Sequence, residues 1–166
     1  MIEQYTFATN LCYCYGNATE DQIELFSQLV LVAQTYTDSS VRQLEKIRAC
    51  LRSILPLDAR YTAVYVNNQI IGFTIGCNAN QLFDTADIPS KTFCISDIAV
   101  HYDYRRRGIA RKMIQILAMK IIPQYHYLYC HLYPESKMFY LQQKEGGWCF
   151  RGESHGKLCF LKKIVG

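Results

Sequence analysis

The chain has 166 residues, of which 50% are hydrophobic and 19% are charged. This is enough to form one sizeable hydrophobic core, and no shift of composition along the chain indicates a second core. We therefore expect a single domain over residues 1–166. The net charge of +4 is mild and is concentrated between positions 105 and 112, which argues against a wholly basic surface and indicates a local anionic partner.

Eight cysteines are scattered along the chain. The pattern of a secretion signal does not accompany them, so we expect reduced thiols in a cytoplasmic protein. Cys12-x-Cys14 is the only close pair, and without a second Cys or His pair downstream it indicates alternation on a strand and not a metal site. Apolar runs such as Leu29–Ala33 are far shorter than the about 20 residues that span a bilayer, so we expect neither a metal nor a membrane partner.

The first third of the chain predicts a strand and two helices. Alternating apolar and aromatic residues over Gln4–Tyr15 indicate an edge strand. Two capping boxes follow, each with a hydroxyl residue and a glutamine three positions later, and apolar residues then recur at helical spacing. The predicted helices cover about Glu20–Tyr36 and Val41–Leu55, and Pro56 ends the second.

The middle of the chain predicts a hairpin and a central strand. Two β-rich runs, Tyr61–Val66 and Gln69–Cys77, are joined by an asparagine pair that tolerates positive φ. The polar segment Asn78–Lys91 has no period and reads as a loop. Thr92–Val100 is apolar on both faces, which is typical of a central strand.

The last third alternates helices and strands. A helix is predicted over about Gly108–Ile122, a strand over Tyr127–Leu132, and a further helix over Glu135–Lys144. Two short strands, about Trp148–Arg151 and Leu158–Ile164, end the chain. The order β-α-α-β-β-β-α-β-α-β-β indicates an α/β fold.

The strongest chemical pattern is the strand Ile95–Val100 followed by Arg105-x-x-Gly108-x-Ala110 at the start of a helix. A helix N-terminus carries unpaired N–H groups and partial positive charge, and glycine lets a phosphate approach the backbone closely. The arginines add charge and bidentate donors. The alternative interpretation is a solvated arginine run with affinity for nucleic acid.

Two segments resemble the GNAT superfamily of N-acyltransferases. The stretch Ile98–Arg111, read Ile-Ala-Val-His-Tyr-Asp-Tyr-Arg-Arg-Arg-Gly-Ile-Ala-Arg, is similar to that family's strand and pyrophosphate loop, and Phe139–Trp148 is similar to its segment of Tyr, helix end, Gly and aromatic. The resemblance implies a GNAT-like fold, a central mixed twisted β-sheet of about seven strands flanked by about four helices. It also implies an acetyl-CoA-dependent N-acetyltransferase that transfers an acetyl group to a primary amine by direct attack in a ternary complex.

The same resemblance implies how acetyl-CoA, or another short acyl-CoA, is bound. The backbone of the strand would pair with the pantetheine arm, and amides of the loop would hold the pyrophosphate. Whether each arginine side chain meets a phosphate or faces water stays open. The cofactor-binding residues implied are Ile98, Ala99, Val100, Arg105, Arg106, Arg107, Gly108, Ile109, Ala110 and Arg111.

Tyr140 matches the family's tyrosine that protonates the departing thiolate. A phenol suits this role because its pKa, about 10, lies just above that of a thiol. The alternative is an aromatic residue that only packs in the core. Cys94 and Cys130 are interpreted as buried thiols and not as acyl carriers, because no histidine is placed in sequence to activate them.

The general base is not fixed by the resemblance. Many family members have a Glu on the strand before the loop, where this chain has Cys94 and Ser96. Strand alternation points Asp97 to the face opposite Ser96, although a bulge would turn it inward. His131 and Glu135 are further candidates, each with a structural alternative. We expect water-relayed deprotonation assisted by Ser96 or His131.

Other functions remain open at this point. The fold can carry a non-catalytic acyl-CoA-binding or nucleic-acid-binding module, or an acetyltransferase for a macromolecule such as a protein N-terminus or aminoacyl-tRNA. Nucleic acid is not the favoured partner. In the family's layout the acceptor groove includes Tyr36–Ser40 and Gly152–Gly156, which lack a dense acidic cluster, and this argues against a polycationic acceptor. The chain is expected to be a monomer or a homodimer.

Overall fold

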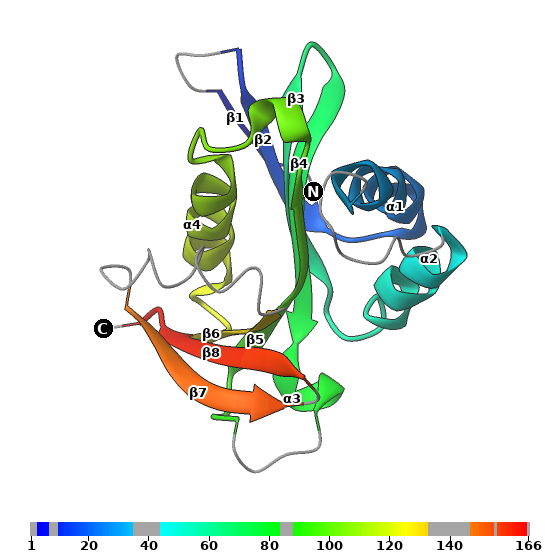
Figure 1. Ribbon diagram of the computed structural model, residues 1–166. Helices are drawn as coiled ribbons and strands as arrows, with labels where there is room; N and C mark the ends of the chain where they lie inside the picture. The colour runs from blue at the N-terminus through cyan, green and yellow to red at the C-terminus, as the bar shows by residue number, and fades with distance from the viewer. Residues whose placement is uncertain are drawn as a thin grey trace.

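A computed structural model describes residues 3–6, 10–34, 44–83, 88–132, 147–154 and 156–165. Figure 1 shows a twisted sheet with α4 on one face and α1 and α2 on the other. The helices are α1 (Glu20–Gln34), α2 (Leu44–Ser53), α3 (Ala79–Leu82) and α4 (Ile109–Ile121), with a 3-10 turn η1 (Tyr102–Tyr104) before α4. The strands are β1 (Glu3–Thr6), β2 (Cys12–Asn17), β3 (Arg60–Val66), β4 (Gln69–Asn78), β5 (Thr92–Val100), β6 (Tyr127–Leu132), β7 (Trp148–Ser154) and β8 (Lys157–Lys163).

The sheet has the order β1-β2-β3-β4-β5-β6-β8-β7. Only the β5–β6 pair is parallel, and every other neighbouring pair among the described strands is antiparallel. The predicted α/β architecture, a mixed sheet between helices, is confirmed. The central strand and β6 begin and end at the predicted residues.

Two elements differ in kind from the prediction, and β7 continues to Ser154, where a turn was expected from Gly152 onward. The opening stretch is two antiparallel strands, with Thr6 paired to Cys12, because apolar alternation alone does not reveal where a chain reverses. The predicted loop after β4 contains α3, which begins where the Asn78 side chain accepts a hydrogen bond from Asn80 N–H at 3.0 Å. A helix of four residues is too short to show a period. The predicted helix Glu135–Lys144 lies outside the described residues.

Helices α1 and α2 cover one face of the sheet. The capping box of α1 is present, since Gln22 Oε1 accepts the backbone N–H of Thr19 at 2.9 Å. Phe26 stacks on Phe73 of β4 with ring centroids 4.4 Å apart, and both are fully buried. Arg48 of α2 donates to Glu24 of α1 at 2.7 Å and so joins the two helices.

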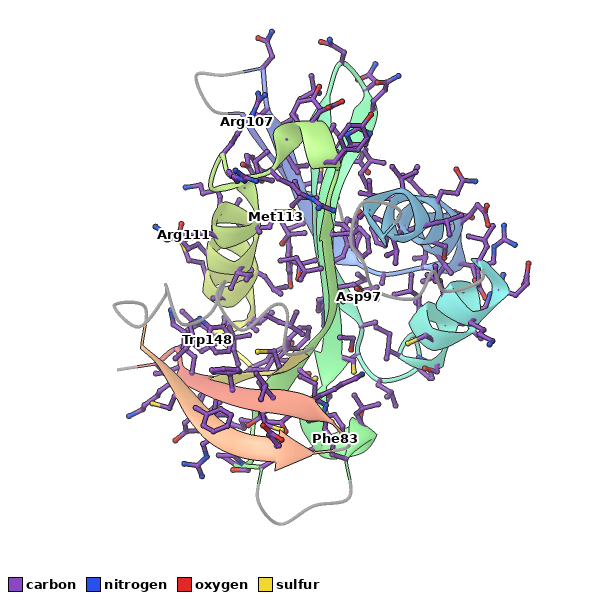
Figure 2. All side chains as sticks on the ribbon, viewed as in Figure 1. Phe83, Asp97, Arg107, Arg111, Met113 and Trp148 are labelled. Carbon is purple, nitrogen blue, oxygen red and sulfur yellow. The ribbon has the colours of Figure 1, made fainter. Side chains whose placement is uncertain are left out.

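Helix α4 covers the other face. Its buried side chains include Met113 and Leu117, and Figure 2 shows Met113 between α4 and the sheet. Because α4 follows directly from the loop after β5, this packing fixes the position of its N-terminus at one end of the central strand.

Candidate functional site

Strands β5 and β6 pair over only part of their lengths. The ladder runs from Thr92 opposite Tyr127 to Ile95 opposite Cys130, while β5 continues to Val100 in contact with β4 on its other side. Beyond Ile95 the β6 side of β5 is therefore a strand edge in the middle of the sheet. Such an edge can accept an extended ligand as an added strand.

Two backbone groups of this part of β5 have side-chain partners. Ile98 N–H donates to the Asp97 carboxylate at 3.1 Å, and the Val100 carbonyl accepts from Arg105 Nε at 3.1 Å. Ile98 and Val100 face α4, whereas Ala99 packs in the core beneath α1 and α2. The predicted strand residues thus lie along the edge where β5 and β6 separate.

A bulge interrupts the β4–β5 ladder beside this edge. Asp97 pairs with Ile75 and Ile95 pairs with Gly76, so Ser96 is an extra residue on β5. A Cβ on Gly76 would lie 2.1 Å from the Cys94 carbonyl oxygen, which is why glycine is needed at this close approach.

The bulge changes which face Asp97 occupies. Ser96 Oγ lies 3.9 Å from Cys77 Sγ, on the side covered by α1 and α2. Asp97 is in step with Ala99 and lies on the same side, as Figure 2 shows. Regular alternation, which would point Ser96 and Asp97 to opposite faces, therefore does not hold here, and the alternative of a bulge that turns Asp97 inward is confirmed.

His131 reaches this same face from β6. Its Nε2 lies 2.7 Å from the Tyr129 hydroxyl, and its ring stands edge-on to Phe83 with centroids 5.1 Å apart. Burial, followed by a hydrogen bond to Cys159, holds the pKa of Tyr129 well above its ordinary value of 10.0, so this phenol stays protonated near neutral pH. The structure thus brings Ser96 and His131 to one face of the sheet, at the end where β5 and β6 separate.

The loop before α4 ends in a helix N-terminus that is open to a ligand. Gly108 has φ 75°, and a Cβ built on it would meet nothing within 4 Å. The first helical hydrogen bond of α4 runs from Lys112 N–H to the Gly108 carbonyl at 3.0 Å, so the amides of residues 109–111 point out of the helix end. This arrangement suits a phosphate, through the free N–H groups and the helix dipole.

The three consecutive arginines have different surroundings. Arg105 is half-buried, and besides Val100 it donates to the Ala33 carbonyl of α1 at 2.7 Å. Arg107 is exposed, donates to the Asp103 carbonyl at 3.0 Å and lies 5.3 Å from the centre of the Tyr104 ring.

The remaining basic side chains of the loop region face outward. Arg106 is exposed and has φ 60°, and Arg111 is exposed on the first turn of α4. Figure 2 shows Arg107 beside the loop and Arg111 on the side of α4 away from the sheet. Arg107 and Arg111 are thus placed near the open helix end, whereas Arg105 is engaged with two backbone carbonyls.

Several thiols near the site are buried. All eight cysteines lie within the described residues, and none of them is in a disulfide. Burial raises the pKa of the Cys77 thiol to about 11 and that of Cys94 well above its ordinary value. Cys130 is 1% exposed. Buried thiols of this kind are poor nucleophiles, which agrees with their interpretation as core residues.

Two candidate catalytic residues cannot be placed. Tyr140 and Glu135 lie outside the described residues. Within the described ranges, no cluster of three or more His, Cys, Asp or Glu is arranged to hold a metal ion. No helix in the same part of the chain has the length and apolar character needed to cross a membrane.

Sequence reasoning missed Tyr129 as a member of this face, and it allowed Asp97 there only through a bulge. Tyr129 and His131 are two positions apart on a strand, which places both side chains on one face. The sequence alone contains this spacing, so it could have indicated that Tyr129 lies beside His131. Nothing in the β5 sequence marks the bulge, since Ser96 and Asp97 are ordinary strand positions until the register with β4 is known.

Comparison with known proteins identifies the family and the fold of the chain. The family model of the acetyltransferase (GNAT) domain matches residues 58–144. An acetyltransferase from Thermus thermophilus has the same fold, with a TM-score of 0.68 at 16% identity over 91% of this chain and 96% of that chain. Among curated proteins, no sequence matches this chain.

Two further solved structures share the fold. The PaiA N-acetyltransferase from Thermoplasma acidophilum, in complex with coenzyme A, gives a TM-score of 0.66 at 9% identity over 91% of this chain and 98% of that chain. A ribosomal-protein-alanine N-acetyltransferase from Brucella melitensis gives 0.65 at 14% identity over 90% and 98%. The predicted GNAT-like arrangement of a mixed sheet with flanking helices is confirmed.

Proposed function

The chain belongs to the GNAT acetyltransferase family, and we propose that it transfers an acetyl group from acetyl-CoA to a primary amine by direct attack in a ternary complex. One observation carries the proposal. The parallel strands β5 and β6 separate beyond Ile95, and the edge so formed leads to the glycine-led N-terminus of α4. The strand edge can pair with an amide-bearing arm, and the anion site at the end of that edge can bind a pyrophosphate, so the two together fit a ligand that has both groups.

The residues present fit such a cofactor. Amides of residues 106–111 would hold the pyrophosphate, and the open space at Gly108 allows its close approach. Arg107 and Arg111 are the side chains placed to add charge, and the backbone of Ile98, Ala99 and Val100 would pair with the pantetheine arm. The Thermoplasma neighbour is a complex with coenzyme A, which supports this assignment.

When bound, acetyl-CoA supplies a thioester carbonyl to the face that carries Ser96 and His131. The acceptor must lose a proton before or as its nitrogen attacks, and we assign that proton to His131 or to a water relay beside Ser96. The new C–N bond replaces the C–S bond, and the departing thiolate takes a proton from Tyr140. The burial of Cys94 and Cys130, which raises the pKa of the Cys94 thiol, supports one-step transfer without an acyl-enzyme.

A macromolecular acceptor is the second candidate. Exposed Arg106, Arg107 and Arg111 form a basic surface beside the site, which would favour an acidic partner such as tRNA or an acidic protein surface. The Brucella neighbour acts on a ribosomal protein. The two candidates differ in the acceptor and share the cofactor site.

Calorimetric titration with acetyl-CoA and CoA tests the cofactor site. Gly108→Val should lose CoA affinity at least about tenfold, because the side chain fills the space that a phosphate needs. Gly156→Val is the matched control, since Gly156 has φ 72° against 75° for Gly108 and also has nothing within 4 Å, but lies on the β7–β8 turn. Equal loss in both variants, or no binding by the wild type, would contradict the assignment.

Thiol release in the same samples tests transfer. A panel of small amines, peptides and aminoacyl-tRNA should include at least one acceptor that releases CoA thiol from the wild type. CoA binding without release from any of them would favour a binding module. RNA binding that falls steeply with salt, in the absence of CoA binding, would favour the arginine run as a nucleic-acid surface.

A further inference from the structure

The peptide bond between Asp97 and Ile98 directs its N–H toward the open edge of β5. The Asp97 carbonyl accepts from the Thr74 hydroxyl of β4 at 3.4 Å, so this oxygen points to β4. The bond is trans, and in a trans peptide the carbonyl and the following N–H point in opposite directions. Ile98 N–H therefore faces the side on which β6 has separated from β5.

The same orientation returns two residues later. His101 N–H donates to the Ile71 carbonyl of β4 at 2.8 Å, so the Val100 carbonyl points to the open edge. Along an antiparallel strand the backbone groups of successive residues alternate between its two neighbours. The open edge therefore presents the groups of Ile98 and Val100, whereas Ala99 turns its own to β4.

Charged side chains hold both of these edge groups in place of a neighbouring strand. Ile98 N–H donates to Asp97 Oδ1 at 3.1 Å, and the Val100 carbonyl accepts from Arg105 Nε at 3.1 Å. Such contacts are expected where a backbone group lies outside a ladder and still needs a partner. Because an amide has only one hydrogen, a ligand that pairs with Ile98 N–H must take the place of the Asp97 carboxylate.

The carboxylate lies on the side of the sheet proposed for the acceptor. The bulge at Ser96 puts Asp97 on the face of Ser96 and His131, and Figure 2 shows it on the side of α1 and α2. Asp97 is half-buried, and within β5 and β6 it is the only residue with a carboxylate. A partly buried carboxylate that loses one hydrogen-bond donor needs another, and an ammonium group supplies both a donor and the opposite charge.

We propose that Asp97 is the acceptor-binding carboxylate, which holds Ile98 N–H before the cofactor binds and exchanges it for the acceptor's ammonium group when the cofactor arm pairs with that N–H. The proposal rests on the proposed function, which supplies both the arm and the amine. It makes the affinity for the acceptor depend on bound cofactor, because one carboxylate cannot keep both partners fully.

Amide hydrogen exchange followed by NMR tests this change of partners without turnover. In the absence of CoA, Asp97→Ala should speed exchange of Ile98 N–H by at least about tenfold, because that hydrogen is left to water. The Ala99 amide is the internal control, since it points to β4 and should keep its rate. CoA should slow Ile98 exchange in the variant again, because the arm takes the same N–H. A wild-type rate in the variant without CoA, or no protection by CoA, would overturn the proposal.

Calorimetric titration with CoA tests the competition. Asp97→Ala should bind CoA about three- to tenfold more tightly than the wild type, because the carboxylate no longer competes for the amide. Loss of a negative charge alone also favours an anion, and Asp103→Ala controls for this. Asp103 is an exposed carboxylate in η1, beside the phosphate loop, and its loss should change CoA affinity by less than about twofold. Equal gains in both variants would reduce the effect to charge and overturn the proposal.

Kinetics with an amine found by thiol release test the acceptor role. Asp97→Ala should raise the KM for the amine by at least about tenfold while the KM for acetyl-CoA falls. Asp97→Asn keeps the shape and an acceptor oxygen without the charge, so it should shift both constants in the same directions by less. A structural defect would raise both constants, and that result, or an unchanged KM for the amine, would overturn the acceptor role.

Failure of the proposed function gives a different result. A wild type that binds no CoA would contradict the cofactor site, and the exchange at Ile98 would fall with it. CoA binding without turnover of any amine would contradict the proposed transfer and the acceptor role of Asp97, and hydrogen exchange would still decide whether Asp97 holds the Ile98 amide. CoA binding that leaves Ile98 unprotected in Asp97→Ala would overturn the exchange alone.

Discussion

Replacement of Arg105 by alanine should destabilise the protein, although the residue lies in a loop of arginines expected to serve a cofactor. Arg105 donates to the Val100 carbonyl at 3.1 Å and to the Ala33 carbonyl at 2.7 Å. Ala33 is in the last turn of α1, where carbonyls lack helical partners, and that turn contains no basic residue of its own. The guanidinium therefore caps a helix from a distant part of the chain.

The magnitude follows from the two bonds. A hydrogen bond from a charged donor contributes about 1.5 kcal/mol or more when well shielded, which gives about 3 kcal/mol for the pair. Because Arg105 is only half-buried, water can hydrogen-bond to part of the groups that lose their partner. We therefore expect the free energy of unfolding to fall by about 2 kcal/mol. For a chain of this size that corresponds to a fall in Tm of roughly 4–8 °C.

Arg107→Ala is the matched comparison. Arg107 is exposed and makes one hydrogen bond to a carbonyl, so its removal should change the free energy of unfolding by only about 0.5 kcal/mol. Urea unfolding followed by far-UV circular dichroism measures both variants. Calorimetric titration should give the reverse order for CoA affinity, with Arg107→Ala the weaker binder. Equal stability of the two variants would refute the reasoning.

Three further outcomes follow from burial. Gly76→Ala should destabilise the protein by about 3 kcal/mol, because its Cβ would lie 2.1 Å from a backbone oxygen. In the control Gly16→Ala the new Cβ would meet only the edge of a tyrosine ring at 3.3 Å, and the cost should be about 1 kcal/mol or less. Urea unfolding measures both variants. Alkylation by iodoacetamide at about pH 8, followed by mass spectrometry, should modify exposed Cys50 and Cys149 and spare Cys77 in the folded protein. Because burial raises the pKa of Cys77 from 9.0 to about 11, its contribution to stability is complete below pH 9 and is lost as the pH rises to about 11, by up to about 1.4 kcal/mol per pH unit. Cys77→Ala should flatten the fall of the unfolding free energy over this pH range, and an unchanged slope would contradict the assignment.

The sequence predicted the elements that carry strong local signals. The central strand Thr92–Val100 and the helix after Gly108 follow from a continuous apolar run and from apolar spacing with a glycine start. The phosphate loop could be proposed from the sequence for the same reason, since its arginines and glycine are adjacent in sequence. Residues that act together across strands carry no such signal. The pairing of Cys159 with His131 is a matter of register between β6 and β8, which only the folded sheet determines.

The face of Asp97 shows the limit most clearly. Alternation is a reliable rule while a strand is regular, and it placed Asp97 opposite Ser96. The bulge depends on β4, where Gly76 alone permits the approach to the Cys94 carbonyl, so the determinant lies 20 positions away in sequence from Ser96. A glycine in an otherwise apolar strand was the available sign, because glycine there often marks a bulge or a close approach of two backbones.

Arg105 connects the proposed cofactor loop to the helix that covers the proposed acceptor side of the sheet. One of its hydrogen bonds holds the end of β5, from which the phosphate loop begins, and the other holds the last turn of α1, which covers the face of Ser96. The guanidinium of Arg105 therefore connects the start of the loop to α1. Arg105→Ala should therefore weaken the dependence of acceptor affinity on bound CoA more than it weakens CoA binding itself, because the coupling between two sites is a separate free energy from the affinity of either. Calorimetric titration of the acceptor with and without CoA measures this dependence.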